Sequence, residues 1–223
     1  MSLQYSAEIR WILDGDAPTE VKAWFKEDKL CDEEEARVDY YLKFPGDEFV
    51  GIKLRKYPDG GQNLEFKPII RTIKNAQLPD GLTGRAEEWE KWSIHDRAAE
   101  QYAQMLDGEK DVWLAVRKVR WLRKYSADNP VTKKVNPKKD HPDNGCNVEL
   151  TALHFGTIDE IMAEKGRPFW TIGFEAFNDK NRVQNILEDV LKQEVEAEDY
   201  PNELCQYLTI ANSTSYPKWF RSL

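Results

Sequence analysis

Short runs in which apolar and ionised residues alternate are the part of this chain best suited to chemistry. In residues 51–55 (Gly-Ile-Lys-Leu-Arg) and 64–67 (Leu-Glu-Phe-Lys), the ionised residues occupy every second position. Successive side chains of a strand point to opposite faces of a sheet, so Lys53 and Arg55 share one face, as do Glu65 and Lys67. The alternation recurs in three further runs: 7–11 (Ala-Glu-Ile-Arg-Trp), 116–120 (Val-Arg-Lys-Val-Arg) and 147–151 (Asn-Val-Glu-Leu-Thr).

Each of these charged faces has two interpretations. A solvated face of an antiparallel sheet explains any one run taken alone. Solvated faces usually favour Thr, Ser, Gln and scattered charge, whereas here Lys and Arg recur with isolated Glu. Taken together, the runs favour a sheet curled around a bound anion. A barrel without a ligand, in which the charges form cross-strand ion pairs worth ~0.2–1 kcal/mol each, stays open as an alternative.

Composition and net charge limit the class of ligand. The chain has 223 residues, is 40% hydrophobic and 12% aromatic, and carries a formal net charge of −8. This composition excludes a disordered chain, and the absence of a long linker predicts a single domain over 1–223. Net negative charge disfavours binding to nucleic acid polymers or to acidic membranes. Basic residues gather between Arg117 and Lys139, which favours a small anionic ligand over a polymer.

Cysteine usage and hydropathy predict a cytoplasmic protein. Cys31, Cys146 and Cys205 are odd in number and far apart, which favours a reducing compartment over a disulfide framework or a zinc site. No stretch approaches ~20 consecutive apolar residues, and the N-terminus has no signal-peptide character. An acidic surface with eight Trp residues is compatible with a homodimer.

The hydrophobic pattern predicts about eight strands and three or four helices. The predicted strands are Gln4–Leu13, Arg37–Phe44, Val50–Lys56, Asn63–Ile70, Glu88–Ile94, Val112–Tyr125, Asn147–Phe155 and Phe169–Phe177. The predicted helices start near Thr19 and cover Thr157–Gly166, Asp179–Gln193 and part of the Pro201–Leu223 tail. Arg97–Leu106 could form a further short helix. Pro58 to Gly61 is typical of a hairpin turn. The Lys-rich 126–145 segment is either a solvated loop or a guard at the mouth of a cavity.

The fold class predicted from these elements is α+β, an eight-stranded antiparallel closed or nearly closed barrel (tunnel) with helices packed outside. Closure removes the sheet edges, and ~eight strands enclose room for one small ligand. The charged residues would then face inward and the apolar ones outward, beneath the helices. The opposite arrangement, with Trp11, Ile52, Leu54 and Phe66 packed inside, stays open.

A charged interior would need compensation. Two cations ~6 Å apart at an effective dielectric of ~20 repel by about 3 kcal/mol. The nearby acidic residues Glu8, Glu65, Glu149 and Glu175 are potential partners. A polyphosphate would supply further negative charge, and the Arg fork matches phosphate oxygens in bidentate geometry. Carboxylates in the same cavity could instead hold Mg²⁺ or Mn²⁺, which orient water and neutralise charge at a bond being cleaved.

The order of the motifs resembles the CYTH superfamily, the triphosphate tunnel metalloenzymes. The resemblance runs from about Ser6 to Phe220 and rests on short motifs in sequence: Glu8-Ile9-Arg10, Tyr40-Tyr41-Leu42, the runs 51–55 and 64–67, Arg117-Lys118-Val119-Arg120, Val148-Glu149-Leu150-Thr151, Phe174-Glu175-Ala176-Phe177 and Ser215-Tyr216-Pro217-Lys218-Trp219-Phe220. It implies an eight-stranded tunnel whose basic residues bind a triphosphate and whose carboxylates bind a divalent metal.

The resemblance assigns roles to ten residues. It implies phosphate binding by Arg10, Lys53, Arg55, Lys67, Lys118 and Arg120, together called the basic cluster below. It implies metal binding by Glu8, Glu149 and Glu175, with Glu65 as a possible fourth ligand. It identifies no catalytic residue.

Two acidic positions of the family pattern are replaced in this chain. The N-terminal Glu-x-Glu-x-Lys appears as Ser6-Ala7-Glu8-Ile9-Arg10, in which Ser6 stands for the first Glu. The last acidic pair keeps Glu175, but Gly173 or Phe177 stands for its second member. These departures weaken the prediction of hydrolysis more than the prediction of anion binding.

The sequence therefore predicts a metal-dependent phosphohydrolase, with Mg²⁺ or Mn²⁺, that acts on a triphosphate-containing small molecule or on inorganic triphosphate inside a basic tunnel. The alternative is a catalytically impaired module that binds a nucleotide or polyphosphate without turnover.

Overall fold

The computed structural model of the chain describes residues 2–33, 36–43, 48–56, 62–95, 112–128 and 131–222. The predicted helix Arg97–Leu106 and the predicted turn Pro58–Gly61 lie outside these ranges. Within them, none of the helices has the length and apolar character needed to cross a bilayer.

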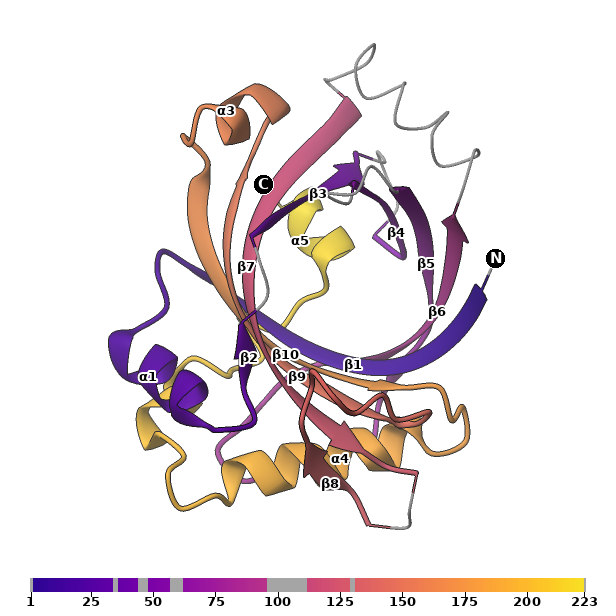
Figure 1. Cartoon of the computed structure of the whole chain (residues 1–223), viewed down its shortest axis with the longest axis vertical. Coiled ribbons are helices and arrows are strands. Elements are labelled where there is room, and N and C mark those ends of the chain that lie inside the picture. Colours follow the sequence, from indigo (N-terminus) through magenta and orange to yellow (C-terminus); the bar gives the residue numbers. More distant parts are fainter. Residues whose placement is uncertain are drawn as a thin grey trace.

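Eight antiparallel strands close into a barrel (Figure 1). In order around the barrel they are β7 (Trp113–Ser126), β3 (Arg37–Leu42), β4 (Val50–Lys56), β5 (Gln62–Ile73), β6 (Ala86–His95), β1 (Ser2–Asp14), β10 (Arg167–Phe177) and β9 (Gly145–Gly156). Pairing of β9 with β7 over the full length of β9 completes the closure. The predicted α+β barrel is confirmed.

The edge of β7 that does not pair with β9 pairs with three other strands, one after another. Beyond β3, this edge pairs with β2 (Asp32–Glu33) and then with β8 (Lys133–Val135). The short strand β8 lies in the segment 126–145 that was predicted as a loop. The lysines of this segment are not among the described residues that line the cavity below. Lys134 instead pairs with Asp28 at 2.7 Å on the outside of the barrel.

The outward face of the barrel carries the main hydrophobic core. Trp11, Leu150 and Ile172 pack there against two helices, α1 (Thr19–Glu27) and α4 (Val183–Val195). Both helices lie on one side of the barrel (Figure 1). Trp11 is completely buried in this outer layer, so the arrangement with the apolar residues inside is excluded.

The inward face is apolar at one end and charged along the rest. Ile12, Val116, Leu153 and Phe169 have the same strand parity as the charged residues, yet they surround Trp219. Trp219 belongs to helix α5 (Tyr216–Arg221), which lies within the ring of strands in Figure 1. Helix α5 therefore fills one end of the barrel and leaves the charged part as a cavity.

Two shorter helices lie among the residues that the structure describes. Helix α3 (Ile158–Met162) begins at a Thr157–Glu160 capping box, as the sequence predicts, although it ends well before Gly166. The 3-10 helix η2 (Asn202–Gln206) precedes the segment that leads to α5.

A buried ionic network joins the outer helices to β7. Arg123 is 2% exposed; its guanidinium pairs with Glu194 of α4 and donates hydrogen bonds to the Trp24 and Phe25 carbonyls at 2.7 and 3.2 Å. The Tyr125 hydroxyl donates to the second Glu194 oxygen at 2.6 Å. The network therefore connects α1, β7 and α4 with charged groups that water does not reach.

Removing Arg123 should destabilise the fold strongly. Arg123→Met leaves Glu194 buried without its main partner, a change that typically costs about 3–5 kcal/mol. Urea unfolding followed by circular dichroism measures the loss. The control is Arg117→Met, which removes a partly exposed arginine from the same strand. Equal stability of the two variants would contradict this role of Arg123.

Candidate functional site

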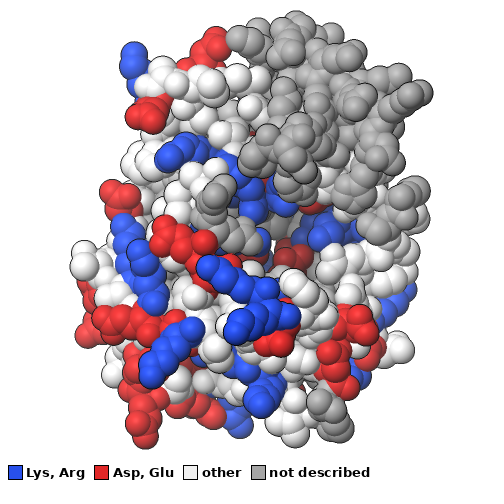
Figure 2. Space-filling view, viewed as in Figure 1, with Lys and Arg blue, Asp and Glu red and all other residues white. Residues whose placement is uncertain are grey.

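A cavity of about 300 Å³ occupies the charged part of the barrel. Figure 2 shows Lys, Arg, Asp and Glu side chains around a hollow on one face of the molecule. Among the described lining residues, nine are Lys or Arg and six are Asp or Glu. The cavity is thus cationic by three formal charges inside a chain whose net charge is −8. A cationic hollow in an acidic protein favours a small anion as ligand.

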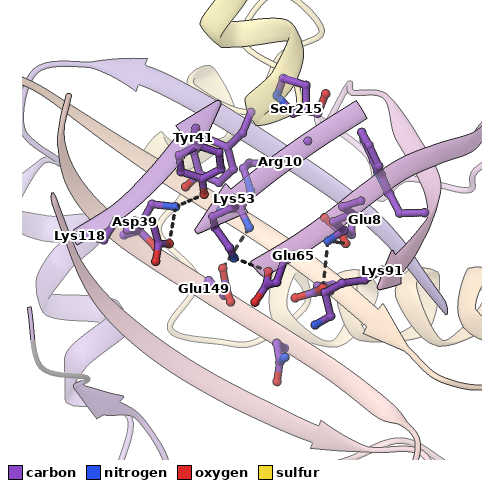
Figure 3. A pocket seen from close by; sticks show the side chains of 18 of the residues that line it. Glu8, Arg10, Asp39, Tyr41, Lys53, Glu65, Lys91, Lys118, Glu149 and Ser215 are labelled. Atoms are coloured by element: carbon purple, nitrogen blue, oxygen red, sulfur yellow. Dashed lines mark hydrogen bonds and ion pairs between the residues drawn. The ribbon is translucent and has the colours of Figure 1, made fainter. Parts of the chain in front are cut away.

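The structure brings all ten predicted site residues into this one cavity. They are Arg10, Lys53, Arg55, Lys67, Lys118 and Arg120 of the basic cluster and the carboxylates Glu8, Glu65, Glu149 and Glu175. They come from six of the eight barrel strands, and Figure 3 shows several of them pointing toward one another. Their placement agrees with the resemblance, while their roles stay predictions.

Asp39 is the most enclosed charge in the cavity. It is 0% exposed, and its carboxylate lies 2.8 Å from Arg55, 3.4 Å from Lys118 and 3.6 Å from Arg37. Burial alone would raise the pKa of Asp39, but Lys53, Lys118 and Arg55 hold it well below its usual range. One carboxylate therefore holds several cations in place, and their combined positive charge exceeds its own.

Glu149 is held between two arginines. Arg10 lies 3.0 Å from one carboxylate oxygen, and Arg120 pairs with the other. Burial would raise the pKa of Glu149, but the two guanidinium groups lower it to about 2. Arg10 also donates to Thr171 at 3.0 Å. Both arginines, which line the cavity, are thereby fixed by a carboxylate of β9.

Gly173 makes room for Arg10. A Cβ atom at Gly173 would lie 2.7 Å from Cζ of Arg10. The space that a side chain at position 173 would fill is therefore taken by a guanidinium group. An acidic side chain at position 173, one of the two positions at which the family pattern expects one, would therefore require Arg10 to move.

Glu8 and Glu175 face each other across β1 and β10. The Lys67 ammonium contacts both, in an ion pair with Glu8 and at 3.2 Å from Glu175. Burial and the neighbouring Glu175 raise the pKa of Glu8, although Lys67 opposes the shift. Ser6 donates a further hydrogen bond to Glu8 at 2.6 Å. One ammonium is thus shared between the two carboxylates.

Aromatic rings form the wall of the cavity beside α5. The Lys118 ammonium lies 4.1 Å from the Tyr216 ring centroid and donates a hydrogen bond to the Tyr41 hydroxyl at 2.7 Å. The Arg10 guanidinium lies 5.0 Å from the same Tyr216 ring. Ring faces attract cations, so Tyr216 orients one lysine and one arginine of the basic cluster.

Burial makes two lysines titratable near neutral pH. It lowers the pKa of Lys118 to about 7, with help from Arg37 and Arg10 and against the attraction of Asp39. Burial likewise lowers the pKa of Lys53 to about 8, against Glu65 and Asp39. An anion bound beside these ammonium groups would favour their charged form.

The affinity for tripolyphosphate should fall as the pH rises from about 6 to 8, because Lys118 loses its proton in this interval. The stability of the free protein should change the other way. An unfolded lysine titrates near about 10.4, so between pH 7 and 10 the unfolded chain binds more protons and stability rises with pH. Titration calorimetry across this range compares the protein with Lys118→Arg, which stays charged and should lose the Lys118-dependent part of the decline. An identical decline in both proteins would contradict the assignment.

The carboxylates of the cavity do not fit a metal ion held by the protein alone. In the described part of the chain, no group of three or more His, Cys, Asp or Glu side chains is arranged to hold a metal ion. Of the predicted ligands, Glu149 is engaged by two arginines, Glu65 by Lys53, and the Glu8–Glu175 pair by Lys67. Mg²⁺ and Mn²⁺ favour free carboxylate oxygens, which this arrangement does not offer.

Sequence reasoning missed Arg37, Asp39, Tyr41 and Tyr216 as lining residues. The first three alternate with Val38, Tyr40 and Leu42, so the same period of two that indicated the other strands could have found them. Tyr216 lies on α5, and no local pattern predicts that this helix enters the barrel.

Comparisons with known proteins concern the fold. A scan against protein-family models and a search of curated proteins give no match. Among solved structures, a conserved hypothetical protein of Pyrococcus furiosus matches at 14% identity, over 87% of this chain and 93% of that chain, with a TM-score of 0.43. A Hippeastrum protein of adenylyl cyclase type, described as having a dominant triphosphatase activity, matches at 14% identity over 97% and 95%, with a TM-score of 0.44.

The capping enzyme triphosphatase of Mimivirus matches at 11% identity, over 85% of this chain and 88% of that chain, with a TM-score of 0.44. Because all three identities are low, the conclusions that follow are drawn from the barrel and the geometry of its cavity.

Proposed function

We propose that this chain, which has the closed tunnel barrel implied by its resemblance to the CYTH superfamily, binds a triphosphate-containing small molecule or inorganic triphosphate in its cavity. The observation that carries the proposal is the convergence of nine Lys and Arg side chains, against six carboxylates, on one hollow of about 300 Å³. Like charges at such proximity repel, so the excess favours a polyanionic ligand.

The chemistry of the basic cluster suits phosphate. Arg10 and Arg120 are fixed by Glu149, and Arg55 is fixed by Asp39, so little side-chain entropy is lost when an anion arrives. Guanidinium forks bind phosphate oxygens in pairs, while the lysine ammonium groups act as point charges. A linear triphosphate would meet fixed cations from several strands at once.

Hydrolysis is the second candidate function. The resemblance implies a metal-dependent phosphohydrolase, but the described carboxylates do not fit a metal held by the protein alone. The observation that favours turnover is the raised pKa of Glu8, since such a carboxylate accepts a proton from an attacking water more readily.

Thermal unfolding with tripolyphosphate tests binding, and phosphate release in the same samples tests turnover. At ~100 times its dissociation constant the ligand stabilises by about 2.7 kcal/mol, which raises the melting temperature of a domain of this size by roughly 5–10 °C. A shift without release supports the binding module. Release, measured in EDTA and in Mn²⁺, supports the hydrolase. Absence of both shift and release would contradict the proposed function.

A further inference from the structure

The position of Lys67 makes this cavity different from a metal-binding site. Glu8 and Glu175 are direct partners in the β1–β10 register, which places their Cβ atoms about 4.5–5.5 Å apart. Two facing carboxylates at such a separation would normally repel each other. The Lys67 ammonium reaches both from β5, two strands away around the barrel, and each of the three side chains is no more than 23% exposed.

The surroundings of this pair offer hydrogen-bond donors in place of further carboxylates. The Ser6 hydroxyl donates to Glu8, and the space above Gly173 is filled by the Arg10 guanidinium. A divalent cation would have to displace Lys67 and would also lie near this second cation. Displacing the Lys67 ammonium from its two carboxylates adds an electrostatic cost to the binding of a divalent cation there.

We propose that the Lys67 ammonium takes the place of a divalent cation between Glu8 and Glu175, so that the cavity receives its anion without Mg²⁺ or Mn²⁺. The protein then carries its own counter-ion for the carboxylate pair as a tethered side chain. The metal-replacement part of this inference stands on the contacts of Lys67 alone, and the part about anion binding rests on the proposed function.

Mn²⁺ alone is the probe for the first part, with binding followed by electron paramagnetic resonance of the free ion. The unmodified protein should leave the Mn²⁺ signal unchanged. Lys67→Ala leaves Glu8 and Glu175 facing each other without the ammonium that bridges them, and it should bind one Mn²⁺ and be stabilised by it. Lys67→Ala with Glu8→Gln should lose this binding again.

Lys91→Ala is the matched control, because Lys91 lines the same cavity and attracts the Glu175 carboxylate but forms no ion pair with Glu8 or Glu175 among the described contacts. It should gain no Mn²⁺ site. Binding of one Mn²⁺ to the unmodified protein would overturn the inference, even if Lys67→Ala failed to fold. A folded Lys67→Ala that binds no Mn²⁺ would also overturn it.

The second part is tested by calorimetry of tripolyphosphate with the unmodified protein in EDTA. Binding in EDTA supports metal-independent recognition. Binding that appears only with Mn²⁺ would overturn the inference while leaving the proposed function in place. Absence of binding in both conditions would overturn the proposed function but leave the Mn²⁺ result on Lys67 to stand by itself.

Discussion

Asp39→Asn should lower the melting temperature by about 10 °C and make the protein unusually responsive to tripolyphosphate. Asp39 is completely buried beside Arg55, Lys118 and Arg37, so its neutralisation leaves these cations without their shared partner. Removing one side of a buried ion pair typically costs about 3–5 kcal/mol, and each kcal/mol corresponds to roughly 2–4 °C in a domain of this size. Differential scanning calorimetry measures the loss.

The increase in melting temperature on adding tripolyphosphate distinguishes a role of Asp39 in the cavity from a general loss of packing. A bound triphosphate supplies negative charge to the same cations, so it should stabilise Asp39→Asn by more degrees than it stabilises the unmodified protein. Asp189→Asn, a change at an exposed position of α4, should alter neither quantity. Loss of stability without an increased response to tripolyphosphate would show that the cations around Asp39 do not face the ligand.

The second large effect is expected from the paired substitutions Lys53→Gln and Arg55→Gln. Both side chains point from β4 into the cavity, and a hydrogen bond to a charged group contributes about 1.5–3 kcal/mol. Loss of two such contacts should weaken tripolyphosphate binding by ~100-fold or more, because every 1.4 kcal/mol is about a factor of ten. Titration calorimetry of the folded variant gives the affinity.

Two controls accompany this measurement. Lys165→Gln with Lys192→Gln removes the same charge from exposed positions outside the cavity and should leave the affinity within a factor of about two, as expected from screening of distant surface charge. Lys53→Gln alone keeps the Arg55–Asp39 pair and gives the answer if the double variant does not fold. Unchanged affinity in a folded Lys53→Gln variant would refute the assignment of Lys53 to phosphate binding, and unchanged affinity in the folded double variant would refute that of β4.

The strands of the barrel could be predicted because the alternation of apolar and ionised residues is visible within each short run of sequence. Strand side chains alternate strictly, and a slip of one residue would move every Lys and Arg of a run to the opposite face. The pattern around Lys53 and Lys118 therefore fixed which side chains share a face, while the choice between the inner and the outer face stayed open until the structure placed Trp11 in the outer layer. Closure of the barrel depends on the pairing of β7 with β9. The prediction of a closed barrel rested more on the resemblance to the CYTH superfamily than on the alternation of residues.

The internal partners of the charges were less accessible to sequence reasoning. Asp39 was visible as an alternating acidic residue, but its importance arises because β3 lies between β4 and β7. That strand order brings Arg55 and Lys118 to the same carboxylate from opposite sides. The alternation in the sequence identifies the residues of such a cluster. It does not show which of them lie next to each other in the barrel.

The departures from the family pattern were visible, but their structural consequence was not. Ser6 and the Gly173 or Phe177 alternatives could be read from the sequence, and they weakened the case for a metal. The structure adds that the Arg10 guanidinium occupies the space at Gly173 and that Lys67 bridges Glu8 and Glu175. Both facts depend on the reach of long side chains across neighbouring strands.

A crystal structure of the protein grown with tripolyphosphate and EDTA tests the central claim most directly. The account predicts the anion inside the barrel, with its phosphate oxygens within hydrogen-bond distance of side chains of the basic cluster and Lys67 still between Glu8 and Glu175. An empty barrel with the anion bound on the outer surface, at a ligand concentration that saturates the protein in solution, would contradict it.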